Sequence, residues 1–118
     1  MKRTYRLYLN DIIQAMRKIE KYSQGLNYDS FVNNDMVIDA MLRNIEVIGE
    51  AAAQIPDTIK QQYSHIPWKK IIGLRNIVIH EYFGVDLDNI WKIVTENIPE
   101  AKQRLVEMFD ELDKKEHS

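Results

Sequence analysis

Residues 68–86 read WKKIIGLRNIVIHEYFGVD, and the rest of the chain can be interpreted around this stretch. Its apolar residues recur every three or four positions, which predicts an amphipathic helix opened by Pro67 and ended by Gly84. At about 100° per residue, Arg75 and Tyr82 share one face of that helix, whereas Asn76 and His80 share the adjacent face. The stretch therefore predicts one polar surface on an otherwise isoleucine-rich helix.

The composition indicates an ordinary globular protein. A length of 118 residues predicts one domain over 1–118, and a hydrophobic content of 45% with 29% charged residues is not that of a disordered chain. The absence of cysteine excludes a disulfide scaffold and a cysteine-ligated metal site. The net charge of −2 argues against general nucleic-acid binding, although Lys69, Lys70 and Arg75 predict a local basic patch.

Two helices are predicted before the central stretch. The first spans about Thr4–Gln24, with Gly25 as a left-handed residue that ends it. A polar connection around Phe31 with one helical turn follows. The second helix starts after Asn34, whose side chain can accept hydrogen bonds from the first free amides, those of Met36 and Val37. The expected buried stripes of the two helices are Tyr5, Leu9, Ile12, Met16, Ile19 and Tyr22, and Ile38, Met41, Ile45, Ile48 and Ala52.

The second helix also carries small residues and a charged stripe. Gly49 and the alanines at 51–53 allow another helix to approach closely on that side. The charged stripe has two interpretations: a solvated face with ion pairs, or a polar wall that faces the Arg75 site. In the second case we expect Glu50 and Arg43 to line the cleft. The stripe consists of Asp39, Arg43, Glu46 and Glu50.

The remaining segments complete an all-α prediction. A short helix is expected over Pro56–Tyr63, and a long one over Leu87–Lys115 with Asp86 as its N-cap. Pro99 should kink or split the long helix, because proline removes a backbone hydrogen bond. The end, about 110–118, is expected to be frayed. No alternating strand pattern occurs, so we predict an up-down bundle of about four main helices plus short ones.

Several function classes are not expected. No run of about 18 apolar residues occurs and the N-terminus is not that of a signal peptide, so we expect a cytoplasmic protein without a membrane span. The three histidines are scattered, and His80 and Glu81 are adjacent on a helix and cannot chelate one ion together. We therefore expect no metal site, and no cofactor motif is present.

Arg75 and His80 together can perform phosphate chemistry. An arginine can bind two phosphate oxygens at once, and a histidine exchanges a proton near neutral pH. These two functions suffice for metal-free RNA cleavage by a ribose 2′-OH. The alternative is structural, because most arginine and histidine residues on amphipathic helices are surface, capping or buried hydrogen-bonding groups. Spacing alone leaves both interpretations open.

The central segment RNIVIHEY, at 75–82, resembles the R-x4-H-x-Y signature of HepT-type toxins, a branch of the HEPN superfamily. Three further blocks strengthen the resemblance: RNIEVIGEA at 43–51, IPWKKIIGLRN at 66–76 and HEYFGVD at 80–86. One departure is Glu81, which stands where many members carry a small residue and adds a negative charge beside His80.

The resemblance implies a HEPN-like homodimer with two arginine–histidine sites facing one cleft, and a metal-independent endoribonuclease that is the toxin of a HepT/MntA (type VII) toxin–antitoxin system. Its partner would be an MntA-like minimal nucleotidyltransferase antitoxin, which transfers AMP from ATP to the motif's tyrosine. By position, Arg75 would stabilise the phosphate, His80 would be the acid and base, Asn76 would bind or orient, and Tyr82 would accept AMP. Arg43 and Glu50 would be supporting residues.

Two other interpretations remain. The chain can be a non-catalytic HEPN subunit that binds or restrains a nucleotidyltransferase, which the charge of Glu81 and the acidic balance favour. It can also be a plain structural helical dimer. The surplus of apolar residues around Ile72, Ile77 and Ile79 fits an interface or a core equally well.

Overall fold

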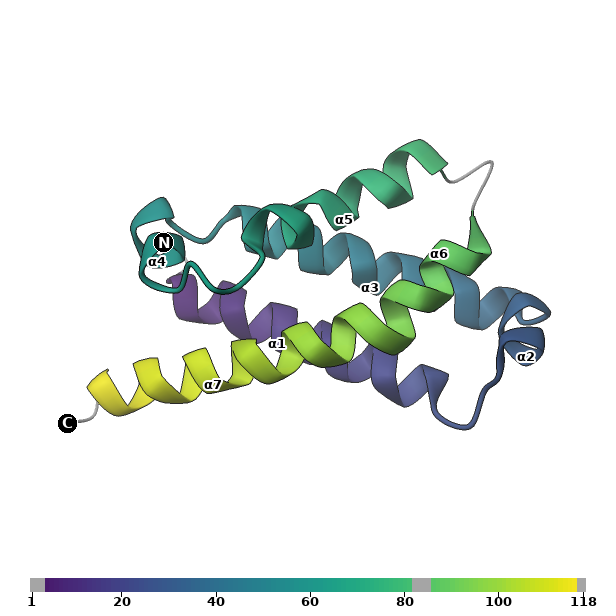
Figure 1. Cartoon of the computed structure of the whole chain (residues 1–118), viewed down its shortest axis with the longest axis horizontal. Helices are drawn as coiled ribbons and strands as arrows, with labels where there is room; N and C mark the ends of the chain where they lie inside the picture. Colours follow the sequence, from purple (N-terminus) through teal and green to yellow (C-terminus); the bar gives the residue numbers. More distant parts are fainter. Residues whose placement is uncertain (1–3, 82–85, 117–118) are drawn as a thin grey trace.

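The computed structural model describes residues 4–81 and 86–116, and the side chains of 4–77 and 86–115 among them. Within these ranges there is no strand, so the predicted all-α class is confirmed. Figure 1 shows α1, α3, α5 and the α6–α7 helix running alternately up and down one long axis. The elements are α1 (Tyr5–Ser23), α2 (Tyr28–Val32), α3 (Asp35–Ala53), α4 (Asp57–Gln62), α5 (Trp68–Glu81), α6 (Leu87–Lys92), the π-helical turn η2 (Ile93–Asn97) and α7 (Ile98–Glu116).

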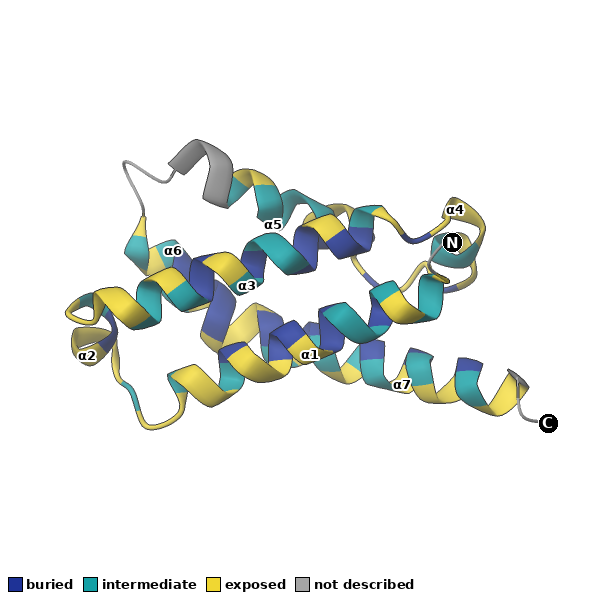
Figure 2. Ribbon diagram, turned by 180° about the vertical axis from the view of Figure 1, so that it is seen from behind, coloured by how far each residue is buried: buried dark blue, intermediate teal, exposed yellow. Residues whose placement is uncertain are grey.

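The core lies between α1, α3 and the C-terminal helix. α1 packs on α3 on one side and on α7 and η2 on the other. Figure 2 shows buried residues along the inward faces of these helices. The predicted stripes are confirmed apart from their ends, because Tyr5 and Ile38 are half-buried and Tyr22 is exposed. The largest fully buried side chains are Phe31, Leu9, Ile12, Met16, Ile19, Met41, Ile45, Ile48, Ile55, Ile66, Ile90 and Ile98.

The helix ends follow the predicted capping residues. Gly25 has a φ of +78°, the left-handed conformation expected of the residue that ends α1. The Asn34 side chain accepts from the Val37 amide at 3.1 Å. The Asp86 side chain accepts from the Asn89 amide at 3.2 Å and caps α6.

The helices α4 and α5 each begin one residue after a proline, whereas the sequence predicted the proline as the first helical residue. Pro56 is the N-cap of α4, with an extended ψ of 145°, and not its first helical residue. Pro67 likewise precedes α5, and its carbonyl accepts from the Ile71 amide at 3.0 Å. A carbonyl that accepts the first intrahelical bond from outside the helix is the mark of an N-cap. The error is one residue at each helix start.

The C-terminal helix is continuous and widens before Pro99. The π-helical turn over Ile93–Asn97 ends two residues before that proline. Because proline lacks an amide and its ring crowds the carbonyl four residues back, a wider turn accommodates it where a strict α-helix would break. The stretch expected to be frayed is helical as far as Glu116, and Leu112 within it is buried. No helix in the described ranges is long and apolar enough to cross a membrane.

Candidate functional site

The site helix α5 is anchored firmly at its N-terminal end. Trp68 and Ile71 are buried there, as are Tyr63 and Ile66 in the turn from α4. The Trp68 ring Nε1 donates to the Tyr63 carbonyl oxygen at 3.0 Å inside the core. This buried hydrogen bond fixes the direction in which α5 leaves the turn.

Beyond Ile71, α5 rises out of the core. Ile72, Leu74, Arg75 and Ile77 are half-buried, and Asn76 is exposed. The reason is that α5 packs principally on α3, so its other sides have few neighbours. Of the apolar surplus predicted on this helix, Ile72 and Ile77 are therefore half-buried residues that pack against the edge of the core. The Ile79 side chain lies outside the described residues.

Arg75 lies where α5 comes close to α3 at Gly49. An ideal Cβ built on Gly49 would lie 2.7 Å from the Arg75 Cβ, 2.7 Å from its backbone nitrogen and 3.1 Å from its Cα. Ordinary contacts of a Cβ atom begin near 3.4 Å, so only glycine fits at this position. The close approach predicted from the small residues of α3 is confirmed, and it places the backbone of Arg75 directly on that helix.

The charged stripe of α3 divides into two parts. Glu50 faces the site: its Oε2 lies 3.7 Å from Nη1 of Arg75, with the two side chains 54% and 34% exposed. Arg43, 72% exposed, instead pairs with Glu46 along its own helix at 3.9 Å. The polar-wall interpretation therefore holds for Glu50 and the solvated-face interpretation for the Arg43–Glu46 pair. Arg43 and Glu50 still line one shallow hollow of about 350 Å³ between α1 and α3.

The other predicted site residues follow along α5. Asn76 presents its side chain to solvent beside Arg75. His80 is in the last turn of α5, five residues after Arg75, and its side chain lies outside the described residues. Tyr82 also lies outside them. The backbone of α5 thus carries Arg75, Asn76 and His80 on one helix, as the sequence predicts.

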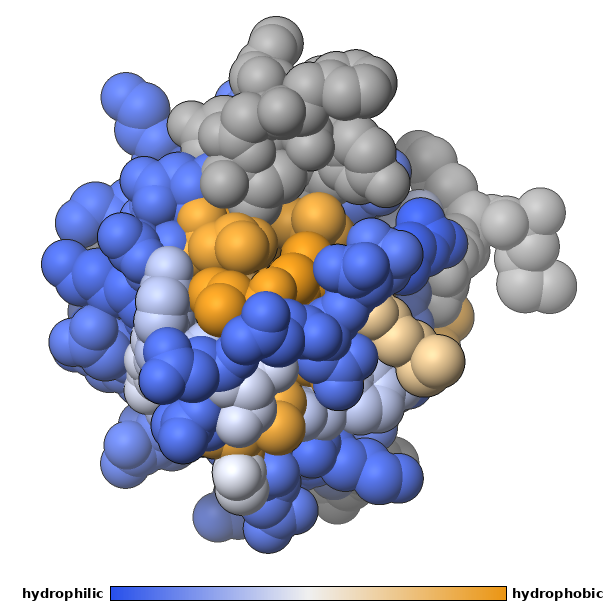
Figure 3. Space-filling view, turned by 90° about the vertical axis from the view of Figure 1, so that its right-hand side faces the viewer, coloured by the Kyte–Doolittle hydropathy of each residue, from blue (hydrophilic) through white to orange (hydrophobic). Residues whose placement is uncertain are grey.

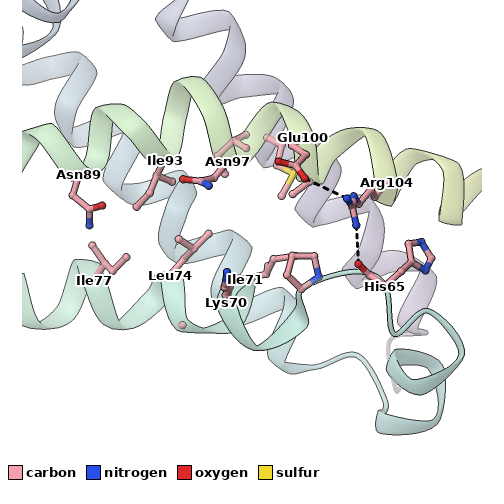
Figure 4. Close-up of a pocket in the computed structure, with 15 residues that line it drawn as sticks. His65, Lys70, Ile71, Leu74, Ile77, Asn89, Ile93, Asn97, Glu100 and Arg104 are labelled. Carbon is pink, nitrogen blue, oxygen red and sulfur yellow. Dashed lines mark hydrogen bonds and ion pairs between the residues drawn. The ribbon is translucent and has the colours of Figure 1, made fainter.

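A groove separates α5 from the C-terminal helix. It has a volume of about 580 Å³ and is walled by apolar side chains that include Leu74, Ile77 and Ile93 (Figure 4). At one end Arg104 Nη1 donates to the His65 carbonyl oxygen at 2.8 Å. Sequence reasoning did not find this groove, because its polar residues on α6 to α7 follow no spacing that separates them from a solvated face.

The surface at the far end of the bundle is partly apolar. Figure 3 views the end of the bundle at which α5 ends and α6 begins, and it shows an exposed hydrophobic area framed by hydrophilic side chains.

Among the described residues, no group of three histidine, aspartate or glutamate side chains could hold a metal ion. The described side chains of α5 offer a cation, Arg75, and an amide, Asn76, which can bind phosphate oxygens, and the carboxylate of Glu50 on α3 can orient that cation.

Comparison with known proteins assigns the family. The sequence profile of the family described as "Ribonuclease HepT-like" matches residues 12–108. A protein of Methanocaldococcus jannaschii named a "putative RNase" is 38% identical over 104 residues, 88% of this chain and 95% of that relative. A "probable ribonuclease HepT" of Thermococcus cleftensis is 38% identical over 102 residues, 86% of this chain and 93% of the relative.

A third relative is longer. It is a protein of Methanocaldococcus jannaschii named "Gamma-glutamylcyclotransferase and putative RNase", 37% identical over 118 residues. The match covers all of this chain but 53% of that protein, so the chain spans about half of this relative's length. No solved structure matches the chain. The family match and the two full-length relatives confirm the predicted class of enzyme, a ribonuclease, and the chain belongs to the HepT-like ribonuclease family of the HEPN superfamily.

Proposed function

We propose that the chain is the toxin of a toxin–antitoxin system: a metal-independent endoribonuclease that acts on RNA in the cytoplasm. One HEPN domain over 1–118 would carry the activity. The observation that supports this best is the setting of Arg75. Its backbone packs against Gly49 and its side chain stays 34% exposed, so the cation is held in place yet accessible to a phosphate.

Each proposed site residue has one task in the cleavage. His80 takes the proton from a ribose 2′-OH, and the resulting oxygen attacks the neighbouring phosphorus. Arg75 stabilises the charge that accumulates on the phosphate oxygens. The bond to the 5′ oxygen breaks, and that oxygen takes a proton from a histidine in its acid form. The products are a 2′,3′-cyclic phosphate and a 5′-hydroxyl end. Asn76 binds or orients the phosphate, with Glu50 and Arg43 as supporting residues.

A homodimer is part of the proposal. The half-buried apolar residues Ile72, Leu74 and Ile77 give α5 an incompletely covered surface, which a second copy would bury. Two copies facing each other would bring two Arg75 residues, and the exposed Lys69 and Lys70 of each, to one cleft. Such a cleft would attract RNA although the chain has a net charge of −2.

The nuclease assignment is tested by expression of the protein alone. Arg75→Ala and His80→Ala should relieve growth arrest and lower RNA cleavage in the presence of EDTA by about 10²- to 10⁴-fold, because each removes a group that acts in the transition state. Arg17→Ala and His65→Ala, at exposed positions outside the site, are the matched controls and should stay toxic. Folded Arg75 and His80 variants that remain as toxic as the controls would exclude the assignment.

Silencing is proposed to act through Tyr82. An MntA-like nucleotidyltransferase would transfer AMP from ATP to its hydroxyl, which adds bulk and negative charge next to the motif and repels RNA. Co-expression should therefore give a Tyr82 peptide heavier by AMP in mass spectrometry. Tyr82→Phe should stay toxic in the presence of the partner, whereas Tyr22→Phe, a change at an exposed tyrosine of α1, should be silenced normally. Silencing with an unmodified Tyr82 peptide would rule this mechanism out.

A second candidate function is a non-catalytic HEPN subunit that binds or restrains a nucleotidyltransferase. The negative charge of Glu81 directly after His80, and the acidic balance of the chain, favour it. This candidate predicts that the purified protein leaves total RNA intact and changes the rate at which the partner transfers nucleotides. The proposed toxin predicts cleavage instead.

A further inference from the structure

Gly49 is a glycine in the interior of a 19-residue helix, where alanine would stabilise the helix better. Its neighbours at 51–53 are all alanines, so the composition of α3 does not explain it. The contact geometry does, since a Cβ here would lie 2.7 Å from two atoms of Arg75, one of them a backbone nitrogen. A backbone atom of a packed helix cannot rotate away as a side chain would.

Glu50 adds a second contact to the same residue. It follows Gly49 on α3, and its carboxylate lies 3.7 Å from the Arg75 guanidinium. Both groups are partly exposed, so water screens the attraction and the pair adds little to stability. Its effect is directional: Gly49 sets the depth of the Arg75 backbone against α3, and Glu50 sets the side on which the guanidinium lies.

We propose that Gly49 is the positioning residue for Arg75, with Glu50 completing a two-point seat on α3. This inference rests on the proposed nuclease function and goes beyond it, because neither residue needs to touch RNA. A methyl group at 49 would push α5 outward by at least several tenths of an ångström to reach ordinary contact distances. Misplacement of a catalytic group by about 1 Å can cost about 10²-fold in rate.

Gly73 provides a matched control. It lies in α5 itself, two residues before Arg75, and an ideal Cβ there meets nothing within 4 Å. Gly49→Ala and Gly73→Ala are therefore the same chemical change in two helix interiors, one against a backbone and one into open space. For Glu50→Gln the control is Glu20→Gln, which breaks another interhelical pair, with Lys102 at 2.6 Å.

The experiment uses the full chain and, as a probe, total RNA in EDTA, with kcat and KM measured on the RNA that the unsubstituted protein cleaves fastest. Gly49→Ala should lower kcat about 10- to 100-fold with KM changed less than about twofold, since ground-state binding to other cations is kept. Glu50→Gln should lower kcat by a smaller factor in the same way. Gly73→Ala and Glu20→Gln should keep the original kcat. The Arg75 side-chain Nε–Hε NMR signal should shift only in the two site variants.

The outcomes separate the two claims. An unsubstituted protein that leaves RNA intact overturns the proposed function, whereas Gly49→Ala with the kcat and Arg75 signal of Gly73→Ala overturns the positioning role alone. Circular-dichroism melting shows whether each variant folds. If Gly49→Ala does not fold, Glu50→Gln decides: a kcat equal to that of Glu20→Gln overturns the inference, and a selective loss supports it.

Discussion

Helix α3 meets α1 on one side and α5 on the other, and the two interfaces differ in kind. Both α1 and α3 contribute large, fully buried side chains to the core, among them Ile12, Met16, Ile45 and Ile48. The contact with α5 differs because it includes the close approach at Gly49 and a partly exposed ion pair. The first interface buries apolar surface and supplies stability. The interface with α5 holds the Arg75 cation at the surface. It requires a glycine inside α3, which lowers the stability of that helix relative to alanine.

We expect this difference to be largest when one isoleucine of each helix is replaced by alanine and the losses of stability are compared. Ile48→Ala, at a side chain with no exposed area, should lower the free energy of unfolding by about 2–5 kcal/mol. Ile72→Ala, at a half-buried side chain of α5, should cost less than about half as much when the monomer is unfolded, because less apolar surface returns to water. Urea unfolding of both variants makes the comparison. Equal losses would show that α5 is as much a part of the core as α3.

The anchor of α5 gives the next largest effect. Trp68→Phe keeps a ring in place but removes the Nε1 donor and part of the buried ring volume, while the Tyr63 carbonyl oxygen keeps its hydrogen bond from the Ile66 amide at 3.0 Å. We expect a loss of about 1–3 kcal/mol in the free energy of unfolding, from the lost hydrogen bond and the lost packing together. Trp91→Phe is the control, since that half-buried ring packs on Phe31 with 5.0 Å between ring centroids and a phenyl ring can retain such a contact. An anchor variant no less stable than the control would argue against a fixed α5 start.

The N-cap of α6, the first helix after the site, should contribute less to the free energy of unfolding. Asp86→Ala removes the acceptor that caps α6 at the Asn89 amide, and we expect a cost of about 1 kcal/mol. Asp86→Asn keeps an acceptor and should be near neutral. Thermal melting of the two variants tests this. If asparagine costs as much as alanine, the charge of Asp86 matters and not its cap.

The smallest effect is confined to alkaline pH. Burial, followed by the charge of Glu111, raises the pKa of Tyr63 above the usual 10.0. A raised pKa in the folded state means that the unfolded chain loses its proton first as pH rises. The stabilising contribution is therefore complete below pH 10 and is lost through the folded pKa. Urea unfolding at pH 8 and pH 11 should show a steeper loss for the original protein than for Tyr63→Phe.

The core was predictable because its signals are local and periodic. The spacing of Leu9, Ile12 and Met16 is that of a buried helical face, and Asn34 and Asp86 are strong N-cap residues. The helix starts at Pro56 and Pro67 were missed by one residue, because proline fits both the N-cap and the first helical position. The π-helical turn before Pro99 was not predictable in form, since the sequence shows only that a regular helix is disturbed there.

The site was predictable in part. The small residues of α3 indicated a close helix approach, and Arg75 is the residue that meets Gly49. Which charged residue of the stripe faces Arg75 depends on the rotation of α3 against α5, which no local pattern encodes. The structure gives that place to Glu50 and leaves Arg43 paired with Glu46. Partners and chemistry remain predictions, because they depend on a second chain, an RNA and a nucleotidyltransferase.

The two ends of the described chain lie side by side. Arg6 near the start of α1 forms an ion pair with Asp113 near the end of α7. The Arg6 Cζ atom also lies 5.4 Å from the centre of the Phe109 ring. The end of α5 and the start of α6 lie at the opposite end of a 48 Å long axis (Figure 1). A fused domain, purification tag or fluorophore joined at either end would therefore be held away from His80. The same geometry suits tandem architectures such as the longer relative, in which an HepT-like part occupies about half of the protein.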